Sequence, residues 1–269
     1  AQVRFLGNLV RWAGVGDSTA AGPEGLNDPD RLDAAQKGRF LAMVAEPSAV
    51  RVESSFAGTG RPVPSGTKQS VPGVLVMFVV MTVLIGGSEA LTREKQSGTL
   101  RRLVTTPLSA SQVLAGKTLG LTLLGLVQVA ILIVATDALA AFGVGDMDFR
   151  WAPILVGVAP TLVAYCVCVA ALGLMLSGFL STPQQAESLA WLFGMGLSAL
   201  GGAWWPLEIM PGPMQTVGQF FPTSWAMQGL HTVITYGQGV AGTLLPVAVL
   251  LGMAAVFWAV GSRTMRVVE

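Results

Sequence analysis

Residues 89–117 read EALTREKQSGTLRRLVTTPLSASQVLAGK, and this stretch decides how the rest of the chain is arranged. An uninterrupted apolar run lies on each side of it, long enough to cross a bilayer as a helix. The stretch itself carries five cations, namely Arg93, Lys95, Arg101, Arg102 and Lys117. A basic segment between two membrane-length runs must lie in water at one membrane face. We call residues 89–117 the elbow.

The composition is that of a membrane protein rather than a soluble one. Hydrophobic residues make up 52% of the 269 residues and charged residues only 12%, whereas soluble domains carry about a quarter charged residues. Fifteen of the 31 charged side chains precede Val71, so the chain divides into a polar segment, residues 1–70, and an apolar body, residues 71–269. With a net charge of +1 and no long basic tract, we expect no nucleic-acid partner.

The polar segment mixes short apolar pieces with turn formers, such as GTGRPVPSG at residues 58–66. Helical spacing over residues 30–44 and alternation over residues 50–53 predict a small mixed α/β segment. Because the polar segment begins abruptly at Ala1, we expect it to be incomplete and to follow one further membrane span.

The apolar body predicts an all-α polytopic helical bundle. Five runs are candidate membrane spans: residues 71–88, 115–142, 153–180, 189–205 and 243–261. Residues 206–242 are apolar as well, but their prolines cut them into pieces too short to span. We expect outer re-entrant helices there; a loop that merely lies on the membrane surface remains the alternative.

The short loops predict the orientation of the bundle. The elbow and the tail after Gly261 contribute seven Lys and Arg residues, whereas residues 143–152 and 206–242 contribute only Arg150 and His231. Because cytoplasmic loops carry the excess of positive charge, we expect the elbow and the C-terminus in the cytoplasm. Residues 1–70 are then extracytoplasmic.

Catalytic and nucleotide-binding patterns are incomplete in this chain. Gly116-Lys117-Thr118 resembles the end of a phosphate-binding loop, but Ser111 stands where that loop needs glycine. Lys117 more simply extends its amine to the membrane surface from the start of a span. His231 has no acidic neighbour in sequence for hydrolytic chemistry. We therefore expect neither an enzyme nor a cofactor or metal site.

Two polar side chains, Gln128 and Asp137, lie inside a predicted span. Ionisable and polar groups within a membrane are functional candidates by default. We therefore treat both as candidates for a translocation path. The alternative for Asp137 is that it reaches the outer membrane interface, because it lies near the end of its span.

The elbow carries the pattern Glu94-x-x-x-Gly98-Thr99-Leu100-x-x-Leu103-x-x-Thr106-Pro107-Leu108. It predicts a short helix, a glycine and an amphipathic turn that stops before the proline. Arg101 and Arg102 can reach an acidic groove on a soluble partner. From the residues alone, binding to anionic lipid headgroups is an equal alternative.

This pattern, followed by Gly116-Lys117 at the next span, resembles the permease subunit of type-2 ABC exporters. Pro72-Gly73 before the first span also resembles that family, as do three outer motifs: Trp205-Pro206-Leu207-Glu208, Met210-Pro211, and Phe221-Pro222 with Trp225. The resemblance covers residues 71–269. It implies six spans per permease, an extracytoplasmic segment after the first span, and two permease copies, identical or different, working with two ATPase subunits.

The resemblance also implies roles for particular residues. Contact with the ATPase falls on Glu94, Gly98, Thr99, Leu100, Arg101, Arg102, Leu103, Thr106 and Pro107. Closure of the outer end of the pathway falls on Trp205, Pro206, Glu208, Pro211, Phe221, Pro222 and Trp225.

Taken together, these features predict the permease subunit of an exporter in a prokaryotic plasma membrane. It moves an amphipathic, drug-like or lipid-like substrate by alternating access, while ATP and Mg are bound by the partner ATPase. A membrane assembly or sensor protein that docks a cytoplasmic partner through residues 89–107 is the alternative. An ion-driven transporter is disfavoured, because such proteins need several buried ionisable groups.

Overall fold

In the computed structural model, every regular element of the described residues, 62–97, 110–143, 149–180 and 182–266, is a helix. In chain order they are α3 (Thr67–Gln96), α5 (Ala110–Ala141), α6 (Leu155–Ser177), α7 (Pro183–Leu200), the 3-10 helix η3 (Leu207–Ile209), α8 (Gly212–Gly218), α9 (Pro222–Ile234), α10 (Gly239–Gly242) and α11 (Leu244–Arg266). The predicted all-α polytopic bundle is confirmed. The predicted mixed segment at the N-terminus lies outside the described residues, apart from its last few positions.

Four of these helices are long and apolar enough to cross a membrane: Thr67–Glu94, Gln112–Ala141, Leu155–Ser177 and Leu244–Arg263. A helix spans a bilayer readily because all its backbone hydrogen bonds are made within the segment. These four correspond to four of the five predicted spans. The chain is therefore a multi-pass membrane protein.

The fifth predicted span, residues 189–205, is displaced in the structure. Helix α7 begins at Pro183, where the Thr182 side chain accepts a hydrogen bond from the Gln185 amide, and it ends at Leu200. Its 18 residues include polar first turns and are not among the four membrane-length helices. The helix stops there because Gly202 adopts a φ of 85°, which favours glycine.

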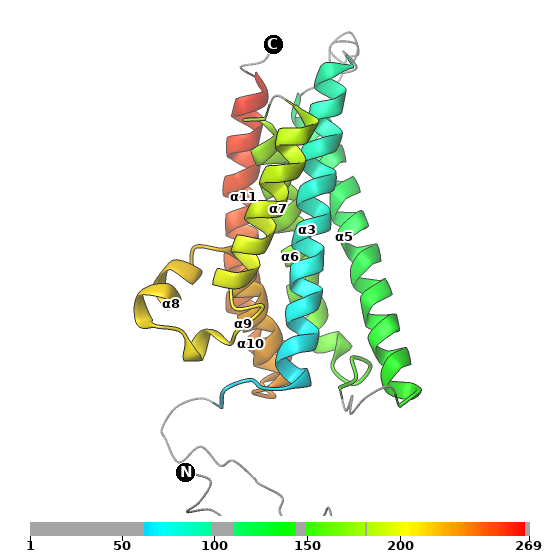
Figure 1. Cartoon of the computed structure of the whole chain (residues 1–269), viewed down its shortest axis with the longest axis vertical. Helices are drawn as coiled ribbons and strands as arrows, with labels where there is room; N and C mark the ends of the chain where they lie inside the picture. Colours follow the sequence, from blue (N-terminus) through cyan, green and yellow to red (C-terminus); the bar gives the residue numbers. More distant parts are fainter. Residues whose placement is uncertain (1–61, 98–109, 144–148, 181, 267–269) are drawn as a thin grey trace, which may run out of the picture. The chain divides into compact units, whose positions relative to one another are not determined.

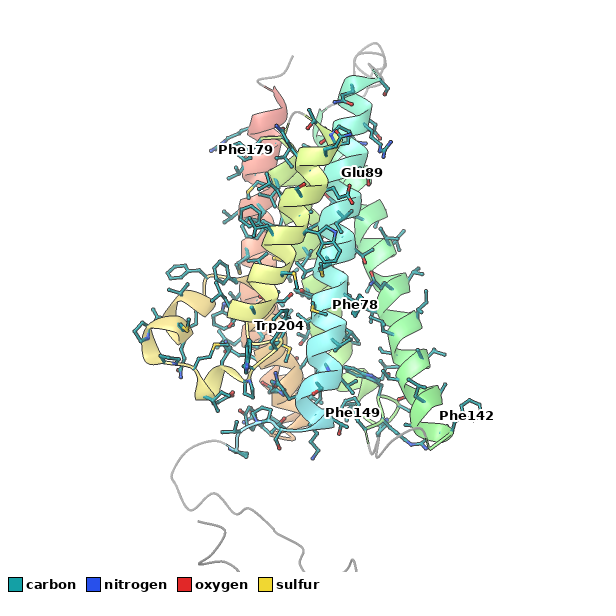
Figure 2. All side chains as sticks on the ribbon, in the orientation of Figure 1. Phe78, Glu89, Phe142, Phe149, Phe179 and Trp204 are labelled. Carbon is teal, nitrogen blue, oxygen red and sulfur yellow. The ribbon has the colours of Figure 1, made fainter. Side chains whose placement is uncertain are left out.

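Helix α6 occupies the centre of the bundle and packs against α3, α5, α9 and α11. Its Tyr165 is fully buried, and the hydroxyl donates a hydrogen bond of 2.9 Å to the Val76 carbonyl of α3. Helix α5 lies at the periphery (Figure 1) and exposes much of its apolar surface. At its end, Phe142 projects away from the bundle (Figure 2) and is 83% exposed.

The helices define two ends of the bundle (Figure 1). At one end, which we call the elbow end, α3 and α11 finish and α5 begins. At the other end, the re-entrant end, α3 begins, α5 finishes and the short helices η3, α8, α9 and α10 gather. The described parts of the elbow, residues 89–97 and 110–117, thus lie at the opposite end of the bundle from the short helices.

The hydrogen bond between α6 and α3 predicts a measurable contribution to stability. Tyr165→Phe should lower the free energy of unfolding by about 1 kcal/mol, because it removes one interhelical hydrogen bond inside the membrane. Titration of the full-length protein with SDS in mixed micelles measures this loss. Tyr236→Phe is the matched control, because the Tyr236 hydroxyl hydrogen-bonds Glu208 in an exposed position. Equal effects of the two changes would contradict the prediction.

Candidate functional site

The elbow end of α3 contains Glu94, one of the nine residues predicted to contact an ATPase. The other eight, Gly98, Thr99, Leu100, Arg101, Arg102, Leu103, Thr106 and Pro107, lie outside the described residues. The Glu94 carboxylate forms an ion pair with the Lys117 ammonium group of α5. The two side chains are 32% and 20% exposed, respectively. The pair therefore joins the two helices that flank the elbow in sequence.

A second ion pair lies one turn away on α3, between Glu89 and Arg93. Figure 2 shows Glu89 near the elbow end of α3. The pair has i,i+4 spacing within a single helix, and its Arg93 side chain is 68% exposed. Exposed pairs of this kind contribute only a few tenths of a kcal/mol. This pair therefore stabilises a helical turn, whereas the Glu94–Lys117 pair connects two helices.

Two buried hydroxyl groups lie in the same part of α3, and one of them reaches α7. The Ser88 hydroxyl donates to the Leu84 carbonyl and lies 3.4 Å from the Ala186 carbonyl of α7. The Thr92 hydroxyl donates to the Ser88 carbonyl, and both side chains are buried. The last turns of α3 thus contact α7 on one side and α5, through the ion pair, on another.

The two candidates for a translocation path, Gln128 and Asp137, lie far apart on α5. Nine residues separate them, which is two and a half helical turns, so their side chains lie on opposite sides of the helix. The Gln128 amide donates to the Phe78 carbonyl of α3 at 3.2 Å. Its Oε1 is buried and has no hydrogen-bond partner among the described residues. The structure does not bring the two side chains together.

Asp137 instead holds the segment that precedes α6. Its carboxylate accepts a hydrogen bond of 2.8 Å from the Trp151 amide, and the Trp151 indole donates to the Thr136 hydroxyl at 3.0 Å. Trp151 is fully buried and meets Phe149 edge to face at 5.0 Å. These contacts give Asp137 a structural role at the re-entrant end; a role in translocation stays a prediction.

At the re-entrant end, residues 206–242 form short helices, as their prolines predict. Helices α8 and α9 have 7 and 13 residues, and each carries a proline in its first turn. Most of α9 is buried, and it packs against α3, α6 and α11. In contrast, α8 projects away from the bundle (Figure 1). The segment is therefore partly inserted among the long helices rather than a loop on their surface.

The residues predicted to close the outer end are distributed around this segment. Trp204 and Trp205 lie against each other with ring centroids 5.6 Å apart, and Trp204, labelled in Figure 2, donates to the Met77 sulfur of α3. Glu208 accepts from the Tyr236 hydroxyl at 3.0 Å, and the Trp225 indole donates to the Gln219 carbonyl at 2.7 Å. The remaining predicted residues, Pro206, Pro211, Phe221 and Pro222, stand at the beginnings of η3, α8 and α9. They position short helices and do not converge on one point.

The first turns of α3 pack closely against the turn that follows α7. The Gln69 side chain donates to the Gly202 carbonyl at 2.8 Å. A methyl group on Gly73 would lie 2.0 Å from the Ala203 carbonyl oxygen, so only glycine permits this approach. Gln69 was not predicted as a site residue. The Pro72-Gly73 motif marked this part of α3 in the sequence, but it did not indicate that α3 would contact the turn after α7.

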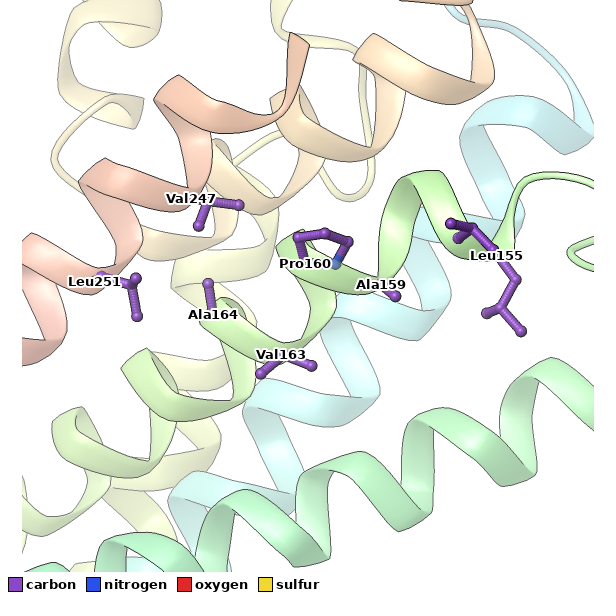
Figure 3. A pocket seen from close by; sticks show the side chains of 8 residues that line it. Leu155, Ala159, Pro160, Val163, Ala164, Val247 and Leu251 are labelled. Carbon is purple, nitrogen blue, oxygen red and sulfur yellow. The ribbon is translucent and has the colours of Figure 1, made fainter. Parts of the chain in front are cut away.

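An open apolar groove lies between α6 and α11 in the re-entrant half of the bundle (Figure 3). Its volume is about 580 Å³, and it is lined by Leu155, Val156, Ala159, Pro160, Val163, Ala164, Val247 and Leu251. Pro160, which cannot donate a backbone hydrogen bond, lies in the wall of the groove. Such a lining accommodates aliphatic chains.

The packing of Gly73 predicts that an added methyl group destabilises the protein at Gly73 but not at Gly252. Gly73→Ala should lower the free energy of unfolding by about 2 kcal/mol, because the added methyl group must displace the turn after α7. Gly252→Ala in α11 is the control, since nothing lies within 4 Å of its added methyl group. It should be neutral or stabilise by up to about 1 kcal/mol through helix propensity. Thermal unfolding of both variants in detergent checks the difference, and a Gly73→Ala variant as stable as the unsubstituted protein would contradict it.

Comparison with known proteins gives a consistent result over most of the chain. The profile of the ABC-2 family transporter protein matches residues 41–263. The linearmycin resistance permease protein LnrN of Bacillus subtilis (strain 168) is 30% identical over 202 residues, which cover 75% of this chain and 50% of LnrN. The probable multidrug ABC transporter permease YbhR of Escherichia coli (strain K12) is 29% identical over 147 residues, covering 55% of this chain and 38% of YbhR. The chain thus spans at most half the length of these relatives.

Proposed function

The chain belongs to the ABC-2 family of membrane transporter proteins, and on this premise we propose that it is the permease subunit of an ATP-driven exporter. The observation that carries the proposal is the elbow: a basic segment flanked by two membrane-length helices whose ends are joined by an ion pair. Such a segment is suited to receive a soluble ATPase and to pass its movement to the helices. ATP and Mg would be bound by that partner, and a second permease copy would complete the pathway.

The orientation that fits this function puts the elbow end in the cytoplasm of a prokaryotic cell. The elbow holds five Lys and Arg residues, and the last turns of α11 carry two more, Arg263 and Arg266. Helix α11 finishes at the same end of the bundle as α3 (Figure 1). Positive charge gathers on the cytoplasmic side of membrane proteins. The re-entrant end, with α8 and α9, would then face outward and close the outer end of the pathway.

The cargo that the chain fits best is amphipathic, drug-like or lipid-like. The four membrane-length helices carry few charged residues, and the groove between α6 and α11 is lined by apolar side chains. A strongly charged or ionic cargo would need polar groups along its path. The names of the two relatives, a resistance permease and a probable multidrug permease, agree with this class of cargo.

Alternating access is the mechanism that we propose for this transport. ATP binding draws two ATPase subunits together, and each pushes an elbow against the ends of α3 and α5. A partner can shift a conformational equilibrium only through contacts that differ between the two states. Arg101 and Arg102 for docking, with Leu100 and Leu103 as apolar anchors, are the contacts that we assign to the elbow.

Reversal of charge on the elbow tests this function. The full-length protein is purified together with its partner ATPase, and Arg101→Glu/Arg102→Glu is compared with the unsubstituted protein. The change should abolish co-purification and reduce stimulated ATP hydrolysis by about tenfold or more, because truncating or reversing docking charges costs several kcal/mol. Arg263→Glu is the matched control, since Arg263 is an exposed cation at the same end on α11.

Two outcomes would contradict the proposal. Unchanged complex formation and unchanged ATP hydrolysis in the doubly substituted protein would remove the elbow from the ATPase interface. Docking of a cytoplasmic partner without uptake of an amphipathic fluorescent substrate into inverted vesicles would favour the alternative, a membrane assembly or sensor protein.

A further inference from the structure

The Glu94–Lys117 ion pair has a position that ATPase docking does not explain. The two residues are 23 positions apart, on the last turns of α3 and the first turns of α5, and the chain between them contains the elbow motif. Of the two ion pairs between described residues, this is the one that crosses from helix to helix. Both side chains are more than half buried, so the Glu94 carboxylate is turned toward α5.

Helix α5 contacts the bundle along its length, and a few of these contacts lie at its elbow end. Its long apolar surface is largely exposed, as at Leu119, Ile131 and Val134. Near the ion pair, Leu114 is buried against Leu174 of α6. One turn further into the bundle, the backbone of Gly87 on α3 lies close to the Leu121 side chain. The ion pair thus joins α5 to α3 within this packed region at the elbow end.

Folding stability alone is a weak reason for such a pair. Partly exposed ion pairs add little to stability, because the charges are already well solvated when they are apart. In this position the geometry of the pair matters more than its contribution to stability. The pair fixes which turn of α3 lies beside which turn of α5. A push on the elbow would separate the ends of α3 and α5 unless the two were fastened together.

We propose that Glu94 and Lys117 form a clasp that makes the two helix ends of the elbow move as one body, so that force applied to the elbow reaches α5 as well as α3. Glu94 is then a positioning residue inside the permease rather than a docking contact for the ATPase. This inference deepens the proposed function and rests on it for its role in transport, although the clasp itself can be tested without any partner.

The first experiment measures the clasp in the full-length protein alone. Spin labels on Gln96→Cys and Ala115→Cys, both at exposed positions, report the distance between the ends of α3 and α5 in lipid nanodiscs. The native cysteines, Cys166 and Cys168, are buried and should remain unlabelled. Lys117→Gln should broaden the distance distribution, whereas Arg93→Gln, which removes the pair within α3, should leave it unchanged. A distribution for Lys117→Gln as narrow as that of the unsubstituted protein would overturn the clasp.

The second experiment measures coupling in the complex with the ATPase. Glu94→Gln and Lys117→Gln should each retain complex formation and ATP hydrolysis but lower transport per ATP by about fivefold or more, the lower limit of typical coupling between sites. Glu89→Gln and Arg93→Gln, which break the pair within α3, are the charge-matched controls and should have no effect. The exchanged pair Glu94→Lys/Lys117→Glu should recover both the narrow distance distribution and most of the coupling, which also excludes a general loss of folding.

The outcomes separate the clasp from its alternatives. If Glu94→Gln weakens complex formation, Lys117→Gln does not, and the exchanged pair remains defective, then Glu94 is a docking contact and the clasp is wrong. If the unsubstituted protein binds no ATPase, the proposed function fails, but the distance measurement still decides whether the ion pair fastens α3 to α5.

Discussion

The hydrocarbon interior of a bilayer contains no water to satisfy backbone N–H and C=O groups, and the helical architecture of this bundle follows from that constraint. The long apolar segments must be helical, because only a helix satisfies its own backbone within one segment. Where the backbone departs from a long helix, at residues 201–212, it is held by neighbouring groups such as the Gln69 side chain. Buried side-chain donors likewise find backbone carbonyls, as Tyr165 finds that of Val76.

Helix α3 connects the two candidate sites. Its 30 residues extend roughly 45 Å at the usual helical rise. At the re-entrant end, Gln69 and Gly73 hold the turn that leads into the tryptophan pair and η3. At the elbow end, Ser88 contacts α7 while Glu94 reaches α5. One continuous helix therefore links the described start of the elbow, residues 89–96, to the turn before the short helices.

The sequence predicted the long helices well but not the contacts between side chains. The apolar runs located α3, α5, α6 and α11, because length and hydropathy alone determine membrane-length helices. The predicted span at residues 189–205 begins later than α7, which begins at Pro183 after the N-cap Thr182. The first turns of α7 are polar, so hydropathy does not detect where this helix begins. Asp137 was marked as an unusual polar group, but its partner Trp151 could not be identified, since a side chain's partner depends on how the chain turns between them.

The sequence by itself determined the class of protein, the polar elbow between two apolar runs, and the motifs that place the chain in its family. Those properties are local, because they depend on residues that are neighbours along the chain. Only the tertiary structure decided that Lys117 pairs with Glu94 instead of extending to the membrane surface alone, and that Gly73 lies against Ala203. Both contacts join residues that are distant in sequence, and their partners are set by the packing of helices, which no periodicity within one segment records.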